Sequence, residues 1–443
     1  NMSEQSKSAA LYDRASQVMP GGCSRNTILR KPHPIYAAKG EGCFVTDIEG
    51  VKRIDFANNV ASLIHGHAHP RIVQAVNAQL ANGSAFTLGT EIEVAYAEQM
   101  VARCPNFDKI RFVNSGTEAV MSCIKAARAY TGRAKIAKVE GSYHGLYDYA
   151  EVSQTAKPTS WGDADAPNSV PVAKGTPQSA LDDVVVIPFN DAKRAIAILD
   201  AHKSDIGGIL IDLLPHRIGV IPALPAFVEA LRNWATVNGA LMIIDEVITF
   251  RTNFGGTQAD YNIKPDLTAM GKMIGGGFPV GAIAGRAEVM DVMDPTQGPA
   301  AFPHYGTFNA NPITMTAGSV AMQMFDQPAV AALNALADTA RSALSEAIRI
   351  ADVPACVTGR GSMFRIHMKE QAPTTYRNAF VGPQEQACIS ALLDHMFDNG
   401  LIMIETCSGL LSTPMTQGEI DHLADTALSG LRKIKPLLLA AAA

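Results

Sequence analysis

The sequence predicts an α/β protein with a mainly parallel sheet covered by helices, and a smaller α+β domain beside it. From about residue 90, helical stretches alternate with short apolar segments: KIRFVN, AKIAKVE, DVVVIPF, GGILIDLL and ALMIIDEV. Strands that are apolar on both faces and separated by helices are typical of parallel sheets. After about residue 320, a long helical segment, strand-like pieces (MFRIHM, LIMIET, LLSTPM) and a final helix predict the smaller domain.

The predicted domains divide the chain near residues 75 and 325. Residues 1–75 contain a helical segment, Ala9–Val18, and a hairpin pattern in GCFVTDIEGVKRIDF. We therefore expect this segment to join the C-terminal small domain, residues 326–443. Residues 76–325 form the predicted large domain, and a helix is predicted across its start in HPRIVQAVNAQLANG, residues 69–83.

Composition excludes several classes of function. The chain has 443 residues, 47% of them hydrophobic and 18% charged, and a net charge of -5. This mild charge argues against a nucleic-acid or anionic-membrane partner. Seven cysteines without a C-x-x-C pair indicate reduced thiols. The N-terminus lacks the apolar core of a signal peptide, and no apolar run is long enough for a membrane span, so we expect a cytoplasmic protein.

Ligands of parallel sheets bind at the carboxyl ends of the strands. Asn114–Ser115, Ser142–His144 and Asp245 each follow a predicted strand. In RFVNSGTEAV the strand leads through a small-residue turn into a helix, whose free N–H groups at Ser115, Gly116 and Thr117 would bind an anion such as a phosphate. Helix capping by Ser115 or Thr117 is the alternative interpretation of the same residues, and both stay open here.

Three other motifs resemble nucleotide or metal sites, but their sequence context does not support those sites. ALMIIDEV resembles a Walker B strand, but Gly271–Lys272 is followed by Met273, so there is no Walker A loop. GGGFPVGAIAG lacks the strand and acidic residue of a dinucleotide site. His65, His67 and His69 in HGHAHP lie in a turn, where local hydrogen bonds are expected rather than a metal site.

Together the groups fit one cofactor, pyridoxal 5'-phosphate. Its phosphate needs the anion-binding helix start, and its ring needs a stacking partner such as Tyr143. Its ring nitrogen needs a carboxylate, for which Asp245 is the candidate, and its aldehyde needs a lysine, for which Lys272 is the candidate. An enzyme of this type is therefore favoured over a nucleotide-binding protein.

Several motifs in order resemble the class III aminotransferases of pyridoxal phosphate fold type I. These are NSGTEA, GSYHG, IIDEV, DLTAMGKMIGGGFPVGA and HYGTFNANPITMTAG, together with the PGG start and the HGHAHP turn. The resemblance covers about residues 10–435. Within the class, the chain is most similar to the glutamate-1-semialdehyde aminomutases and the β-amino acid aminotransferases. A catalytically silent member of the fold is disfavoured because Lys272, Asp245 and Tyr143 are all present.

The resemblance implies a role for each residue of the cofactor site. Lys272 would bind the cofactor as a Schiff base and, once displaced by substrate, move a proton. Asp245 would pair with the ring nitrogen, and Val247 would pack on the ring face opposite Tyr143. The phosphate would be held by Ser115, Gly116 and Thr117 and by Thr307 of the partner subunit of a homodimer, with Glu118 and His144 behind these groups.

For the substrate, the resemblance implies that Arg25 binds a carboxylate, although a surface arginine is an equal alternative; Arg217 is a second, weaker candidate. Three positions differ from the related enzymes. Cys407 stands near a glutamate of the aminomutases, Thr406 near an arginine of the β-amino acid aminotransferases, and Val60 at an aromatic position.

These differences, and IDLLPH in place of the usual Glu-Pro, predict an apolar pocket. The predicted reaction moves an amino group between a donor with an apolar side, which is an amine or an amino acid such as a β-amino acid, and a keto acid. An aminomutase or another isomerase on the same cofactor is the alternative. The long, Pro-rich segment 153–177 is a candidate lid.

Overall fold

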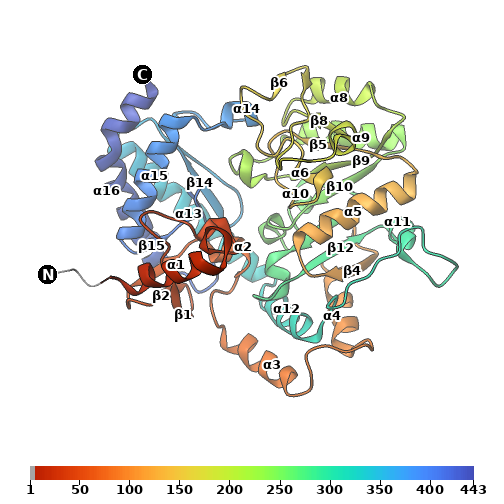
Figure 1. Ribbon diagram of the computed structural model, residues 1–443, viewed down its shortest axis with the longest axis horizontal. Helices are drawn as coiled ribbons and strands as arrows, with labels where there is room; N and C mark the ends of the chain where they lie inside the picture. The colour runs from red at the N-terminus through yellow and green to blue at the C-terminus, as the bar shows by residue number, and fades with distance from the viewer. Residues whose placement is uncertain (1–4) are drawn as a thin grey trace.

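The computed structural model describes residues 5–443 and contains a central seven-stranded sheet in the order β4-β12-β11-β10-β9-β5-β8 (Figure 1). Its strands are β4 (Lys109–Val113), β5 (Lys135–Val139), β8 (Val184–Ile187), β9 (Ile206–Ile211), β10 (Leu241–Asp245), β11 (Leu267–Gly271) and β12 (Gly281–Gly285). All neighbouring pairs are parallel except those of β12, which runs antiparallel to β11 and β4. The predicted mainly parallel sheet is confirmed, with β11 and β12 as strands that the sequence analysis did not identify.

The sheet is buried on both faces, as its apolar strands require. Along β10, Leu241 and Ile243 belong to the cluster on the side of α5 (Gly116–Thr131), while Met242 and Ile244 belong to the cluster with α9 (Pro225–Asn238). Each cluster removes apolar surface from water, which stabilises the fold by roughly 25 cal/mol per Å² of buried apolar surface. This packing fixes the carboxyl ends of the strands, where the predicted site residues lie.

The N- and C-terminal segments form a second unit, in which the red and blue parts of the chain lie side by side (Figure 1). Strand β3 (Lys52–Asp55) pairs in parallel with β15 (Leu401–Ile402), in a sheet with β1 (Ala37–Glu41) and β2 (Phe44–Asp47). A second sheet joins β13 (Cys356–Thr358), β14 (Met363–His367) and β16 (Ser408–Leu410). The division of the chain at residues 75 and 325 stays a prediction.

The remaining helices pack around these sheets. They include α1 (Lys7–Val18), α3 (Pro70–Leu80), α4 (Glu91–Val101), α8 (Ala192–Asp200), α12 (Pro312–Met324), α13 (Gln327–Ala351), α15 (Pro383–Asp398) and α16 (Gln417–Ala442). One predicted strand is misplaced. LLSTPM, residues 410–415, lies mostly outside β16, because Leu411 and Met415 pack into the core while Thr416 already caps α16.

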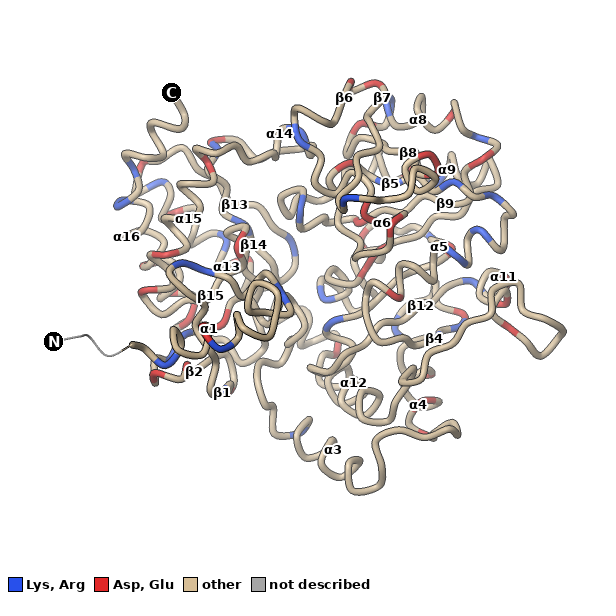
Figure 2. Tube along the Cα trace, viewed as in Figure 1, with Lys and Arg blue, Asp and Glu red and all other residues tan. Residues whose placement is uncertain are grey.

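The charged residues and the cysteines agree with the expectations from the composition. Basic and acidic residues are interspersed along the chain rather than gathered on one element (Figure 2). All seven cysteines are free thiols. Within residues 5–443, no helix combines the length and apolar character needed to cross a bilayer. The predicted polar N-terminus begins in residues 1–4, which lie outside the described part.

The candidate lid, residues 153–177, is held by several contacts. Trp161 packs edge-on against Tyr376 and Phe380. Arg377 donates to the carbonyl oxygens of Trp161 and Gly162 while pairing with Glu140 at 2.7 Å. A small hairpin, β6 (Gly162–Asp163) with β7 (Ala166–Pro167), closes the segment. These contacts favour a fixed segment, and the lid stays a hypothesis.

Candidate active site

Lys272 directly follows β11, at the carboxyl edge of the sheet. Because β10 and β11 are parallel, with Asp245 opposite Ala269, Lys272 and Asp245 leave the sheet at the same edge. Lys272 has a φ of 50°, in the left-handed region that non-glycine residues seldom adopt. Burial lowers the pKa of its amine to about 8, and the nearby Asp245 carboxylate opposes that shift. A buried amine with this pKa is suited to act as a nucleophile and a base.

Asp245 is fixed by two hydrogen bonds. Its Oδ1 accepts the Val247 N–H at 2.9 Å, and its Oδ2 lies 2.7 Å from His144 Nδ1. An ionised carboxylate only accepts hydrogen bonds, so His144 donates. Burial lowers the pKa of His144, against the effect of Asp245, which favours the neutral ring. Asp245 is therefore a positioned anion in a nearly water-free setting.

The start of α5 lies beside these groups. Ser115 caps the helix, since its Oγ accepts the Glu118 N–H at 3.1 Å and donates to Glu118 Oε2 at 2.7 Å. Ser115 is thus the cap of this helix. The N–H groups of Gly116 and Thr117 lie in its first turn, where an anion binds favourably. A Cβ on Gly116 would come within 2.9 Å of Val247 Cγ1, which brings this turn against the segment after Asp245.

Tyr143 and His144 lie in a loop that the sequence analysis placed correctly after β5. The Tyr143 side chain is exposed, and the Arg217 guanidinium lies 5.3 Å from its ring centroid. Lys138, inside β5 and fully buried, holds this loop by donating to the carbonyl oxygens of Ser142 (3.0 Å) and Ala150 (2.7 Å). Burial lowers the pKa of Lys138 to about 7. The sequence signal for this role was a lysine within an apolar strand.

Two further acids near Asp245 have distinct roles. Asp212 directly follows β9, the strand next to β10, and burial and the charge of Asp245 raise its pKa, so its neutral form is favoured. Glu246 accepts hydrogen bonds from Thr249, Thr257 and Gln258, and it therefore supports the fold rather than the site. Sequence reasoning missed Asp212, although the strand-end rule that found Asp245 also applies to it.

Arg25 is brought to a strained segment of the chain. Its Nη1 donates to Asn59 Oδ1 at 2.6 Å. Asn58 through Ala61 all have positive φ, including Val60 at 51°, which is rare for a β-branched residue. Strained backbone of this kind gathers at ligand sites. Arg25 and Val60, both predicted for the substrate, therefore lie on neighbouring segments.

The predicted substrate residue Cys407 is not brought to a surface. Its side chain is fully buried among apolar residues, and burial raises the pKa of its thiol. Its backbone has a φ of 64°, in the left-handed region that non-glycine residues seldom adopt. Thr406 instead lies 3.3 Å from His216 Nε2 and 2.8 Å from Ser408.

The histidines of the HGHAHP turn make local and long-range hydrogen bonds. His65 lies 2.8 Å from the Ala321 carbonyl oxygen, and His67 lies 2.7 Å from Asp55. His69 caps α3. These bonds tie the turn to the C-terminal part of α12 and to β3.

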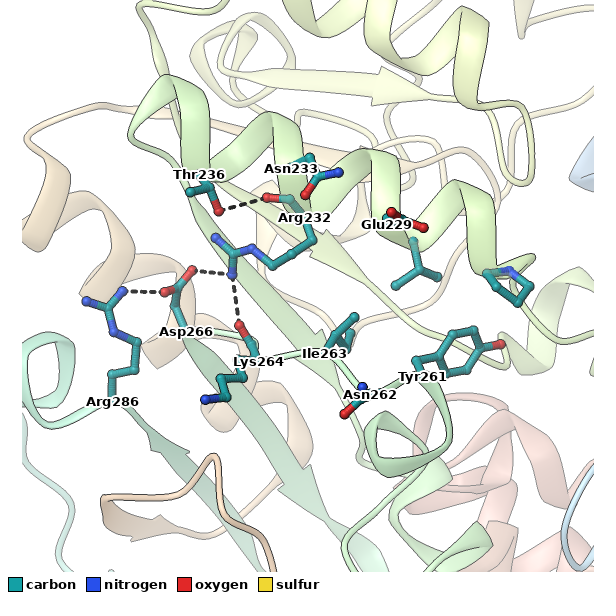
Figure 3. A pocket seen from close by; sticks show the side chains of 12 residues that line it. Glu229, Arg232, Asn233, Thr236, Tyr261, Asn262, Ile263, Lys264, Asp266 and Arg286 are labelled. Atoms are coloured by element: carbon teal, nitrogen blue, oxygen red, sulfur yellow. Dashed lines mark hydrogen bonds and ion pairs between the residues drawn. The ribbon is translucent and has the colours of Figure 1, made fainter.

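A surface hollow of about 640 Å³ lies elsewhere, beside α9 and the amino end of β11 (Figure 3). Its two arginines, Arg232 and Arg286, point at one carboxylate, Asp266, at 2.9 and 2.5 Å. Asp266 also accepts the Met242 N–H. Both arginines are thus paired with Asp266, and the hollow lies at the edge of the sheet opposite to Lys272 and Asp245.

The geometry at the carboxyl edge agrees with comparisons to known proteins. The family model for class III aminotransferases matches residues 28–434. The chain belongs to the class III aminotransferases. Glutamate-1-semialdehyde 2,1-aminomutase of Methanothermobacter thermautotrophicus is 38% identical over 374 residues, which cover 84% of this chain and 86% of that protein.

Solved structures agree in fold over nearly the whole aminotransferase chain. An omega-transaminase from Sphaerobacter thermophilus is 46% identical with a TM-score of 0.95, covering 97% of this chain and 98% of its own. A beta-phenylalanine aminotransferase from Variovorax paradoxus is 31% identical with a TM-score of 0.85, covering 96% and 94%. The predicted fold type and family are confirmed.

Pyridoxal 5'-phosphate is the cofactor of this aminotransferase, as in a related transaminase solved with the cofactor bound. The residues present fit it. The N–H groups of Gly116 and Thr117 begin α5 at the carboxyl edge of the sheet, and no ion pair within residues 5–443 involves the buried amine of Lys272. Asp245 supplies a fixed carboxylate for a ring nitrogen. The individual contacts of these residues with the cofactor stay predictions.

Proposed function

We propose that this aminotransferase moves an amino group from an amine or amino acid with an apolar side to a keto acid, at a site centred on Lys272. The observation that carries the proposal is a buried amine of lowered pKa that leaves the sheet at the same edge as the fixed carboxylate of Asp245. Apolar residues next to the strained segment, including Ala61, Leu214 and Met363, support an apolar substrate side.

Bound pyridoxal phosphate supplies an electron sink for the carbon that loses its proton. In the proposed mechanism, the amine of Lys272 accepts that proton and donates it again in a later step. Asp245, held by His144, keeps a negative charge at the ring nitrogen. The N–H groups of Gly116 and Thr117 would hold the phosphate, and Tyr143 and Val247 would contact the two faces of the ring.

The substrate proposal is tested with paired donors. The purified protein, loaded with cofactor, is given pairs of donors, either primary amines or β-amino acids. The two donors of a pair have side chains of equal length, one ending in a phenyl group and the other in an ammonium group. We expect kcat/KM to be at least about tenfold higher for phenyl, because the apolar wall cannot solvate a charge. Arg25→Ala should lower kcat/KM about tenfold for donors with a carboxylate and leave simple amines unchanged. Equal kcat/KM for phenyl and ammonium donors would refute the apolar pocket.

An aminomutase is the second candidate, favoured by the 38% identity to a protein of that name. Such an enzyme needs no external keto acid. Conversion of glutamate-1-semialdehyde in the absence of any keto acid, at a rate above that of transamination, would therefore establish this candidate in place of the first.

We further propose a homodimer in the cytoplasm. Tyr305 is 87% and Leu88 80% exposed, and both lie in segments next to α12, so an apolar area is open for a second copy. Thr307 is exposed in the same segment, from which it would reach the phosphate in the neighbouring subunit. Seven free thiols support a reducing compartment.

Mixed dimers test the role of Thr307. One subunit carries Lys272→Ala and the other Thr307→Ala. If Thr307 serves the site of the partner subunit, each mixed dimer has one site with both changes and one intact site, so mixing restores about half of the wild-type turnover with normal cofactor affinity. If Thr307 serves its own subunit, no intact site forms and mixing restores nothing.

A further inference from the structure

The loop after β5 contacts two parts of the candidate cofactor site. His144 Nδ1 lies 2.7 Å from Asp245 Oδ2, at the carboxylate predicted to face the ring nitrogen. Gly145 packs against the first turn of α5, because a Cβ at Gly145 would lie 2.5 Å from Thr117 Oγ1. Tyr143, the predicted stacking residue, directly precedes them in the chain. The position of this one loop therefore affects the groups predicted to bind the ring, its nitrogen and the phosphate.

A single buried amine ties the two ends of this loop together. Lys138 Nζ donates to the carbonyl oxygen of Ser142 at 3.0 Å and to that of Ala150 at 2.7 Å. Ser142 directly precedes Tyr143, and Ala150 lies where the chain leaves the loop. The two hydrogen bonds thus close the span 142–150 through one nitrogen atom.

The base of the loop is fixed separately, from its other side. The Gly141 N–H donates to the Ser153 carbonyl oxygen at 2.9 Å. Gly141 also packs against the ring of Tyr376, since a Cβ at Gly141 would come within 2.0 Å of Tyr376 Cδ2. These contacts hold the residue before the span but none within it. The span 142–150 is therefore the part of the loop whose position depends on Lys138.

Lys138 occupies a place where a lysine is costly. Its side chain is fully buried inside β5, and within residues 5–443 it forms no ion pair. Burial lowers the pKa of its amine to about 7, and the nearby Glu151 carboxylate opposes that shift. An apolar side chain would fill the interior of a strand without burying an amine. A residue that costs stability where packing does not require it indicates a role in function.

We propose that Lys138 is a positioning residue of this aminotransferase, which bridges Ser142 and Ala150 and so holds Tyr143 and His144 in place for the cofactor. This inference rests on the proposed function, in which Tyr143 and Asp245 contact the cofactor, and adds the group that sets their geometry. The role requires hydrogen-bond donors rather than a charge, because both acceptors are neutral carbonyl oxygens. A neutral amine still has two N–H donors, one for each carbonyl oxygen.

Two variants separate the donors from the charge. Lys138→Met removes the donors at similar side-chain length, and it should raise the dissociation constant of pyridoxal phosphate and lower kcat, each by about tenfold. Lys138→Gln keeps two N–H donors without the charge and should stay within about threefold of the wild type in both. Losses in Lys138→Gln as large as those in Lys138→Met would overturn the donor role.

The matched control is Lys135→Met, at the amino end of the same strand. Lys135 also donates to a carbonyl oxygen, that of Asp182 at 2.8 Å, but at an exposed position away from the loop. This variant should bind pyridoxal phosphate and turn over as the wild type does. A loss in Lys135→Met equal to that in Lys138→Met would mean that any lysine of β5 has the same effect, and would overturn the inference.

Hydrogen exchange gives a measurement that does not depend on turnover. With pyridoxal phosphate in excess, the amides of residues 142–150 should exchange at least about tenfold faster in Lys138→Met than in the wild type, while those of β12 stay unchanged. Faster exchange throughout the chain would show a general loss of stability and overturn the positioning role. Unchanged exchange in residues 142–150 would overturn it as well.

The outcomes distinguish this inference from the proposed function. If the wild type transaminates but neither loop exchange nor cofactor affinity depends on Lys138, the inference is refuted and the proposed function stands. If the wild type transaminates with no keto acid, the proposed function is refuted. Exchange of residues 142–150 in Lys138→Met then still decides whether Lys138 holds the loop.

Discussion

Lys272→Ala is expected to reduce turnover by about 10⁴-fold or more, while the protein stays folded. The amine acts twice in the proposed mechanism, as the covalent anchor and as the group that moves the proton, and loss of a positioned acid–base group alone costs up to about 10⁴-fold. The change removes a buried cation without an ion pair, so the melting temperature should not fall.

Three measurements check this result. Turnover is followed with a fast donor, folding by thermal melting, and the covalent link by mass spectrometry after borohydride reduction, which should attach the cofactor to the wild-type protein only. Lys264→Ala, at an exposed lysine shortly before β11, is the control and should behave as the wild type. A Lys272→Ala protein that keeps more than about a hundredth of the activity would disprove the role.

The pH dependence of cofactor uptake provides a further check on Lys272. Its pKa is lowered to about 8, so the amine is protonated below pH 8 and neutral above it. Only the neutral amine attacks an aldehyde. The rate of uptake by the cofactor-free protein should therefore rise about tenfold per pH unit up to pH 8 and level off above it. A rate that keeps rising to pH 10 would show that the amine is not perturbed.

The large sheet and most of the cofactor site could be predicted because they depend on local pattern. Asp245 ends a strand after four buried apolar residues, and Ser115 and Gly116 lie where a strand turns into a helix. Strands β11 and β12 were missed because LTAMG and GAIAG are rich in small residues and glycine, which weaken a strand signal. Their packing on neighbouring strands overrides that local preference.

The substrate side could be predicted less well because its residues are brought together by the fold. Arg365 was not singled out within MFRIHM, because its contact with the His216 carbonyl oxygen depends on the loop after β9, some 150 residues earlier in the chain. Cys407 was interpreted from its position near a glutamate of the aminomutases, but its side chain is fully buried in the core. The alternation of residues along a strand does not indicate which distant residues a side chain contacts.

Asp245→Asn is expected to reduce kcat by about 10³-fold and to weaken cofactor binding. Asparagine keeps the shape and can still accept from the Val247 N–H, but it removes the negative charge that would keep a ring nitrogen protonated. Electrostatic groups aimed at developing charge in a dry site contribute about 10²–10³-fold each, and loss of the electron sink adds to that. The Asp245 charge also raises the pKa of Lys272. In Asp245→Asn, the pH at which the rate of cofactor uptake levels off should therefore fall below 8.

The neighbouring acid gives the control for this change. Glu246→Gln alters a carboxylate one residue away that is bonded to Thr249, Thr257 and Gln258, so it should lower the melting temperature and leave kcat within a few-fold. If Glu246→Gln instead abolished turnover and Asp245→Asn did not, the assignment of the two acids would be reversed.

A double-mutant cycle with His144 then tests how Asp245 is held. If His144 acts only by orienting Asp245, His144→Gln alone should cost about tenfold in kcat, and the double variant should be no worse than Asp245→Asn. Additive losses would mean that His144 contacts the cofactor or substrate by itself. Non-additive losses would mean that the carboxylate and the imidazole act as one unit, in which burial keeps the ring neutral and the ring keeps the charge of Asp245 in place.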